Sequence, residues 1–150
     1  MLLLIVKYIH ILAAIIAVGF NISYVVWIIR ARRSPEHTAF ALKGVKFLDD
    51  RIANPSYGVL LITGILMVFL AGYSVTTLWI DVALVLFVLL IVVAVAFYTP
   101  SLRDQIKLVE SGDTTSAEFH RLEQRGQVAG QALAVIVLVI LAMMVFKPTL

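Results

Sequence analysis

The first apolar stretch of the chain, residues 7–29, contains an imidazole at His10 and an amide at Asn21. Ala14 and Ala17 lie between them at steps of three or four residues, so a helix places all four side chains on one face. Polar side chains are costly in lipid and face neighbouring helices or functional sites. A neutral imidazole is a common ligand of haem iron. His10 is therefore our candidate metal ligand, for a haem b held between helices.

Both polar residues also have a structural interpretation. His10 could bond a backbone carbonyl or Asp81, and Asn21 could bond a polar group of another span. The remaining histidines, His37 and His120, fall in charged segments between the apolar runs. A haem on His10 would therefore need a different second ligand, a vacant position or a histidine from another subunit.

The composition excludes a soluble domain. Of the 150 residues, 62% are hydrophobic and 14% are charged, and the mean hydropathy is +1.04. A soluble domain of this size needs more polar surface. Cysteine is absent, which excludes disulfides and thiolate metal sites. The expected partner is the lipid bilayer, with a homo-oligomer or a larger membrane complex as a further partner, and we expect no nucleic-acid binding.

Four apolar runs are long enough to cross a bilayer, which takes about 20 residues. They cover residues 5–29, 56–73, 79–98 and 127–146. The sequence thus predicts an all-α protein, a four-helix antiparallel bundle that forms a single transmembrane domain over residues 1–150. The second and third runs are joined by a short connection, which favours a tight helical hairpin.

The basic residues give the expected orientation. Residues 30–55 contain six of them and residues 99–126 contain four, whereas Lys7 and Lys147 are the two at the opposite ends. This bias predicts a multi-pass protein of the bacterial inner membrane with both termini outside and both long loops in the cytoplasm.

Both loops are expected to be partly helical. Leu42, Val45, Leu48 and Ile52 recur at helical spacing, which predicts an amphipathic helix on the membrane surface or an inner extension of the second span. The acidic pair before Arg51 is interpreted as part of a solvated loop. In the second loop, Thr115 and Glu118 fit a capping box that starts a helix.

The sequence offers no catalytic template. It has no Ser-His-Asp pattern, paired intramembrane carboxylates, phosphate-binding loop or HExxH motif, so no catalytic residue is assigned and enzymatic activity stays open. Gly126 and Gly130 form a GxxxG motif, which favours close packing of helices inside the bundle.

Several segments together resemble a known family. They are KYIHILAAIIAVG at the start, WIIRARR after the first span, DDRIANPSYGVLLITGILM with its Thr63-Gly64 pair, and MMVFKP near the end. These resemble small bacterial four-span integral membrane proteins of unknown function. That family looks distantly related to the HemJ-type protoporphyrinogen oxidases and the copper-resistance D membrane domain, which share a K-x-x-H-I pattern. The resemblance implies that His10 binds haem and that Lys7 pairs with a haem propionate.

The leading interpretation is a small membrane protein that binds haem b, for electron transfer or a tetrapyrrole-related oxidation. His10 would hold the iron, Ala14 and Ala17 would pack on the macrocycle, and Asn21 would line the pocket. One alternative is a cofactor-free accessory or structural subunit of a membrane complex. The other is a small transporter or channel that uses the polar residues near the inner ends of the spans.

Overall fold

The structure, a computed structural model, describes residues 1–33, 35–74 and 77–148. Its main features are four long apolar helices of 32, 33, 33 and 30 residues: Leu2–Arg33, Thr38–Leu70, Leu78–Glu110 and Ala117–Phe146. Each exceeds the roughly 20 residues that cross a hydrocarbon core, and the described ranges contain no strand. The all-α class of a membrane protein with four spans is confirmed, and it is consistent with the predicted four-helix bundle.

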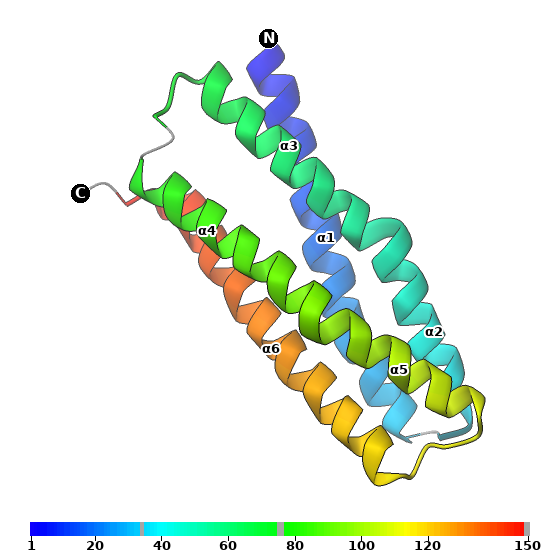
Figure 1. Cartoon of the computed structure of the whole chain (residues 1–150). Coiled ribbons are helices and arrows are strands. Elements are labelled where there is room, and N and C mark those ends of the chain that lie inside the picture. The colour runs from blue at the N-terminus through cyan, green and yellow to red at the C-terminus, as the bar shows by residue number, and fades with distance from the viewer. Residues whose placement is uncertain (34, 75–76, 149–150) are drawn as a thin grey trace. The chain divides into compact units, whose positions relative to one another are not determined.

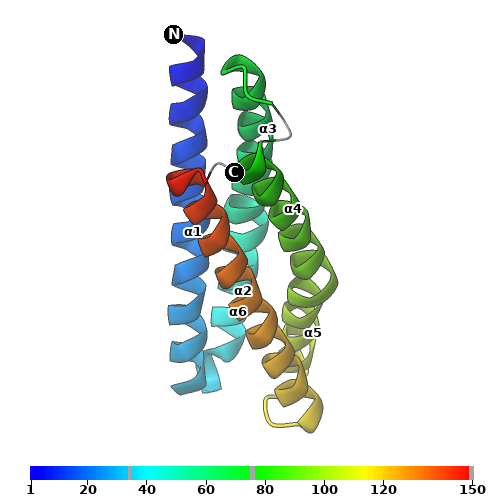
Figure 2. The same ribbon diagram turned by 90° about the vertical axis from the view of Figure 1, so that its left-hand side faces the viewer.

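The chain divides into two compact units, Met1–Ser74 and Val75–Leu150, called unit 1 and unit 2 below. Unit 1 contains α1 (Leu2–Arg33), η1 (Pro35–His37), α2 (Thr38–Leu48), η2 (Asp49–Ala53) and α3 (Asn54–Leu70). Unit 2 contains α4 (Leu78–Val93), η3 (Ala94–Tyr98), α5 (Thr99–Glu110) and α6 (Ala117–Phe146). Within unit 1, α1 lies antiparallel to α2 and α3, and within unit 2, α6 lies antiparallel to α4 and α5 (Figures 1 and 2). The single transmembrane domain and the orientation in the membrane stay predictions.

One long helix of each unit is continuous and the other contains a π-helical segment. Each π-helical segment is followed by one residue and then by a proline. These pairs are Asn54-Pro55 after η2 and Thr99-Pro100 after η3. A proline has no N–H, and its ring clashes with the carbonyl of residue i−4 in a regular α-helix. Widening the preceding turn avoids the clash. Accordingly, the Asn54 N–H donates to the Asp49 carbonyl and the Thr99 N–H to the Ala94 carbonyl, each five residues back.

The core of unit 1 is narrow and lies along α1. The buried side chains of α1 are Val6, Ala13, Ala17, Tyr24 and Ala31. They are spaced by seven or four residues, as in helices that pack along a seam. Small residues at Ala13 and Ala17 let α3 come close, and Ala17 is fully buried.

In unit 2, the glycines of the GxxxG motif allow α6 to pack on α5 and η3. A Cβ on Gly126 would lie 3.2 Å from Gln105 Nε2, and one on Gly130 would lie 3.7 Å from Tyr98 Cε2. Gln105 is buried, and its Nε2 donates to the Leu122 carbonyl of α6 at 3.2 Å. The motif therefore contributes to packing inside the unit.

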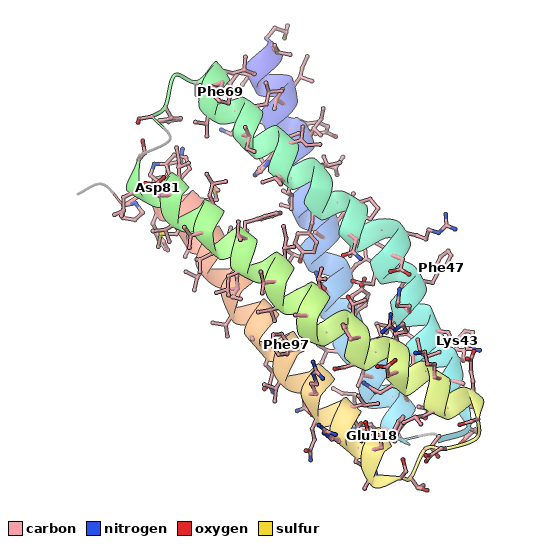
Figure 3. The ribbon with its side chains drawn as sticks, viewed as in Figure 1. Lys43, Phe47, Phe69, Asp81, Phe97 and Glu118 are labelled. Atoms are coloured by element: carbon pink, nitrogen blue, oxygen red, sulfur yellow. The ribbon has the colours of Figure 1, made fainter. Side chains whose placement is uncertain are left out.

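The two long loops are largely extensions of the spans. α2 continues through η2 into α3 without a break in the helix, and it buries Leu42 and Val45 against the rest of unit 1. Of the two alternatives for this segment, the extension of the second span is confirmed. Phe47, on the outer face of α2, remains 61% exposed and projects away from the unit (Figure 3). α5 extends the third span in the same way.

A turn of polar side chains starts α6. Asp113 Oδ1 accepts hydrogen bonds from the backbone N–H groups of Thr115 at 3.2 Å and Ser116 at 2.9 Å. Ser116 is the N-cap, because its Oγ accepts from the Phe119 N–H at 3.0 Å. The capping box predicted from Thr115 and Glu118 is therefore wrong by one residue. The helix begins at Ala117, and Ser116 before it has the extended backbone of an N-cap.

This turn gives a pH-dependent prediction. Hydrogen bonds from the Ser116 hydroxyl and the Ser116 N–H hold the pKa of Asp113 below its usual value. A lowered carboxyl pKa adds stability above the unfolded-state pKa of about 3.9, and this contribution is lost as the pH falls through the folded-state pKa. We expect Asp113→Ala to lower the free energy of unfolding in detergent micelles at pH 7, and the difference from wild type to shrink below about pH 4.

Asp113→Asn is the matched control, because it keeps an oxygen acceptor and removes the titration. Its difference from wild type should be smaller at pH 7 than that of Asp113→Ala. An Asp113→Ala difference that is constant from pH 7 to pH 3 would contradict the role of the ionised carboxylate.

Candidate functional site

The described polar contacts of His10 lead to α3, to the Thr63 hydroxyl and the backbone of Leu60. His10 Nδ1 lies 2.9 Å from Thr63 Oγ1, which joins α1 to α3 inside unit 1. Thr63 is 8% exposed, and it is the buried residue of α3. The sequence interpretation named a backbone carbonyl or Asp81 as the partner of His10. The structure gives a backbone partner, Leu60, and adds the hydroxyl of Thr63, which the sequence did not suggest.

The contacts of Thr63 assign the proton on the imidazole. The Thr63 hydroxyl donates to the Val59 carbonyl, one turn back, at 2.6 Å. Since its single proton is used there, the oxygen accepts from His10, and Nδ1 carries the ring proton. The lone pair of the neutral ring is then on Nε2, which makes Nε2 the atom available for a metal or a hydrogen-bond donor.

Gly64 lets the imidazole lie against the backbone of α3. A Cβ on Gly64 would lie 3.3 Å from His10 Cε1 and 3.8 Å from His10 Nδ1. Any larger side chain would press on the ring and its bond to Thr63. Thr63 and Gly64 therefore form one seat for His10, which we call the Thr-Gly seat.

The other predicted site residues of α1 have different surroundings. Lys7, one turn before His10, is exposed, and Ala14, one turn after it, is half-buried. Ala17 is fully buried at the contact with α3. Of the two alanines, only Ala14 therefore has exposed surface that a ligand could contact.

Asn21 connects the same two helices further along. Its Nδ2 donates to the Tyr57 hydroxyl at 2.6 Å and to the Ala17 carbonyl at 2.8 Å. Both amide hydrogens are thus used inside unit 1, and the predicted interhelical hydrogen bond is confirmed. Such bonds contribute roughly 0.6 kcal/mol each in membrane proteins.

One buried acid was missed by the sequence interpretation. Asp49 is 6% exposed, lies in η2 and accepts a hydrogen bond from Asn54 Nδ2 at 3.3 Å. Its assignment to a solvated loop is wrong, whereas its neighbours Asp50 and Arg51 are exposed as expected. The signal was present in the spacing, because Asp49 continues the row of Leu42 and Val45 by four residues.

The other two histidines are exposed and lie beside glutamates. His37 Nδ1 is 3.3 Å from Glu36 Oε1, and His120 Nδ1 is 3.5 Å from Glu123 Oε2. In the part of the chain that the structure describes, no three histidine, cysteine or acidic side chains gather where they could hold a metal ion.

The comparison with known proteins gives one match. A family with the description "Predicted integral membrane protein (DUF2269)" matches residues 4–148. None of the curated proteins and none of the solved structures matches the chain. The matched range includes His10 and the Thr-Gly seat.

The bond to Thr63 can be tested without any cofactor. In a chain with His37→Asn and His120→Asn, the ¹⁵N NMR signals of the His10 ring should show a single tautomer with the proton on Nδ1. Thr63→Val removes the acceptor, so we expect mixed tautomers and a loss of roughly 0.6 kcal/mol in stability.

Ser56→Ala is the matched control, since the Ser56 hydroxyl donates only to the Ile52 carbonyl of its own helix, at 2.7 Å. It should leave the His10 signals unchanged. Identical His10 signals in wild type and Thr63→Val would contradict the assignment.

Proposed function

The chain belongs to the family described as predicted integral membrane protein (DUF2269), and from that premise we propose that it binds haem b through His10. The observation that carries the proposal is the hydrogen bond between His10 Nδ1 and Thr63 Oγ1. With the ring proton on Nδ1, Nε2 carries the lone pair of an imidazole within a membrane-spanning helix.

This arrangement is what a metal-binding imidazole needs. A ligating histidine almost always donates its other ring N–H to a protein acceptor, which fixes the tautomer and the ring orientation. Thr63 supplies that acceptor, and the absence of a side chain on Gly64 lets the Cε1 and Nδ1 atoms of the ring lie close to α3. A histidine with only a packing role needs neither a defined tautomer nor a lone pair left free.

The neighbours of His10 suit a flat amphiphilic group. Ala14 offers a small, half-buried surface one turn along α1, where an apolar ring could lie. Lys7 is exposed one turn in the other direction, where an ammonium could pair with a propionate. The K-x-x-H-I pattern, which resembles that of HemJ-type oxidases, supports the same assignment of Lys7 and His10.

The proposal covers location and partners as well. A bound haem iron would supply one-electron chemistry, and electron transfer within the bacterial inner membrane is the function we assign. The concentration of basic residues in 30–55 and 99–126 supports a cytoplasmic location for these two segments. His10 is the one histidine placed within a span by the sequence, so a second copy of the chain would be a source of a second iron ligand.

The first experiment is the visible spectrum of the protein purified in detergent after expression with haem supply. We expect a Soret band that shifts on reduction with dithionite. His10→Ala should remove it, and Thr63→Val should weaken haem affinity by roughly 10- to 100-fold, as outer-shell changes do.

His37→Ala and His120→Ala are the matched controls, because both histidines are exposed and lie outside the proposed site. They should leave the spectrum unchanged. A colourless wild-type protein with full helical circular dichroism would contradict the proposal and favour a cofactor-free accessory subunit.

A further inference from the structure

Unit 2 contains a groove of about 460 Å³ between α6 and the helix that includes η3. Its lining residues are Val93, Phe97, Arg121, Gln124, Arg125, Val128, Ala129 and Ala132. The volume falls in the range of small-molecule sites, roughly 300–1,000 Å³. None of these residues belongs to unit 1, so the groove is independent of the His10 site.

The groove has a cationic end and an apolar end. Arg121, Gln124 and Arg125 lie in the first turns of α6, and the lining residues further along α6 are aliphatic. From Arg121 to Ala132 the helix rises about 16 Å. The groove is therefore amphipathic along its length, with charge at the end where the basic residues of unit 2 gather.

The guanidinium of Arg125 is held by a backbone carbonyl and a ring one turn before Pro100. Pro100 has no N–H for the Ala96 carbonyl, which a regular helix would pair with residue 100. Arg125 Nη2 donates to this carbonyl at 3.1 Å, and its Cζ lies 5.4 Å from the centre of the Phe97 ring. Figure 3 shows Phe97 between η3 and α6. The remaining N–H groups of Arg125 stay available at the groove.

The cationic end keeps a net positive charge. Arg121 Nη1 lies 3.5 Å from Glu118 Oε2, but their side chains are 78% and 55% exposed. Exposed pairs of this kind are weak. Among the ion pairs described for residues 77–148, none involves Arg125. Among the described ion pairs, these two guanidiniums therefore have one carboxylate between them, that of Glu118.

The depth of the groove in the membrane matches its polarity. The apolar span predicted for this helix covers residues 127–146. This prediction places Arg121 and Arg125 just before the span, at the level of lipid headgroups, and Val128 and Ala132 within the hydrocarbon. Only an amphiphile meets both ends at once.

We propose that this groove binds an anionic phospholipid. The phosphate would lie between Arg121 and Arg125, because guanidinium groups match phosphate oxygens with paired hydrogen bonds. One acyl chain would run along Val128 and Ala132. Basic pockets between membrane helices at the cytoplasmic side are suited to anionic headgroups, and a free phosphate would leave the apolar part of the groove without a ligand.

The test is native mass spectrometry of the full chain in detergent, titrated with phosphatidylglycerol and with phosphatidylcholine of the same acyl chains. We expect phosphatidylglycerol to bind more tightly. Each arginine should contribute about fivefold to this affinity, as expected for a basic side chain near an anionic lipid. Arg121→Gln is the cleaner single variant, since Arg121 makes no bond to η3 among the described contacts, and Arg121→Gln with Arg125→Gln should remove most of the preference.

Two matched controls separate the parts of the groove. Arg30→Gln with Arg33→Gln removes the same charge from exposed residues at the end of α1 and should leave the preference intact. Ala132→Phe fills the apolar end and should weaken phosphatidylglycerol binding, whereas Ala134→Phe, on an exposed position outside the lining, should not.

Three results would overturn the proposal: equal binding of both lipids, equal effects of the two arginine pairs, or full displacement by inorganic phosphate with no effect of Ala132→Phe. The last result would indicate a site for a free anion. Circular dichroism of each variant identifies any that fail to fold, and Arg121→Gln then decides the outcome.

Discussion

A helix in lipid must pair its own backbone polar groups, and a proline inside it breaks that rule at one carbonyl. Both units depend on how this break is compensated. In unit 2, the carbonyl of Ala96 that Pro100 leaves without a partner accepts from Arg125 of α6. In unit 1, the turn before Pro55 widens, so that the Asn54 N–H donates to the Asp49 carbonyl. The bent helices are therefore held by specific polar contacts as well as by apolar packing.

The polar contacts between helices are few, and each fixes a different depth. His10 and Thr63 join α1 and α3 near the N-terminal end of α1, whereas Asn21 and Tyr57 join them about three turns further along. Between them Ala17 is fully buried, so the two helices are in close contact there. Two polar links with a small-residue contact between them define the register of a pair of helices, because sliding α3 by one turn would break both links. This rigidity is also what keeps the imidazole of His10 in one orientation.

The sequence was sufficient to predict the all-α membrane class and the four spans, since apolar runs of about 20 residues have few interpretations other than membrane-spanning helices. It also identified the face of α1 that carries His10, Ala17 and Asn21, because helical spacing alone determines a face. It could not identify the partner of His10, which lies 53 residues away, since no local pattern encodes a contact between two helices. Asp49 was misassigned because a carboxylate suggests solvent, although the row of Leu42 and Val45 leads to it. The start of α6 was placed one residue early because Thr115 and Ser116 are equally good caps until the backbone conformation of Ser116 is known.

The π-helical segments also affect how this chain tolerates length changes. Each contains one residue more per turn than the α-helix around it, so a deletion of one residue in 49–53 or 94–98 could be absorbed by restoring a regular turn. A deletion in the regular α-helical turns between Val45 and Thr63 would instead rotate everything beyond it by about 100°. It would turn the buried face of α2, with Val45, away from the face of α3 that holds Thr63. Single-residue deletions among relatives should therefore be better tolerated within 49–53 and 94–98 than in the α-helical turns around them.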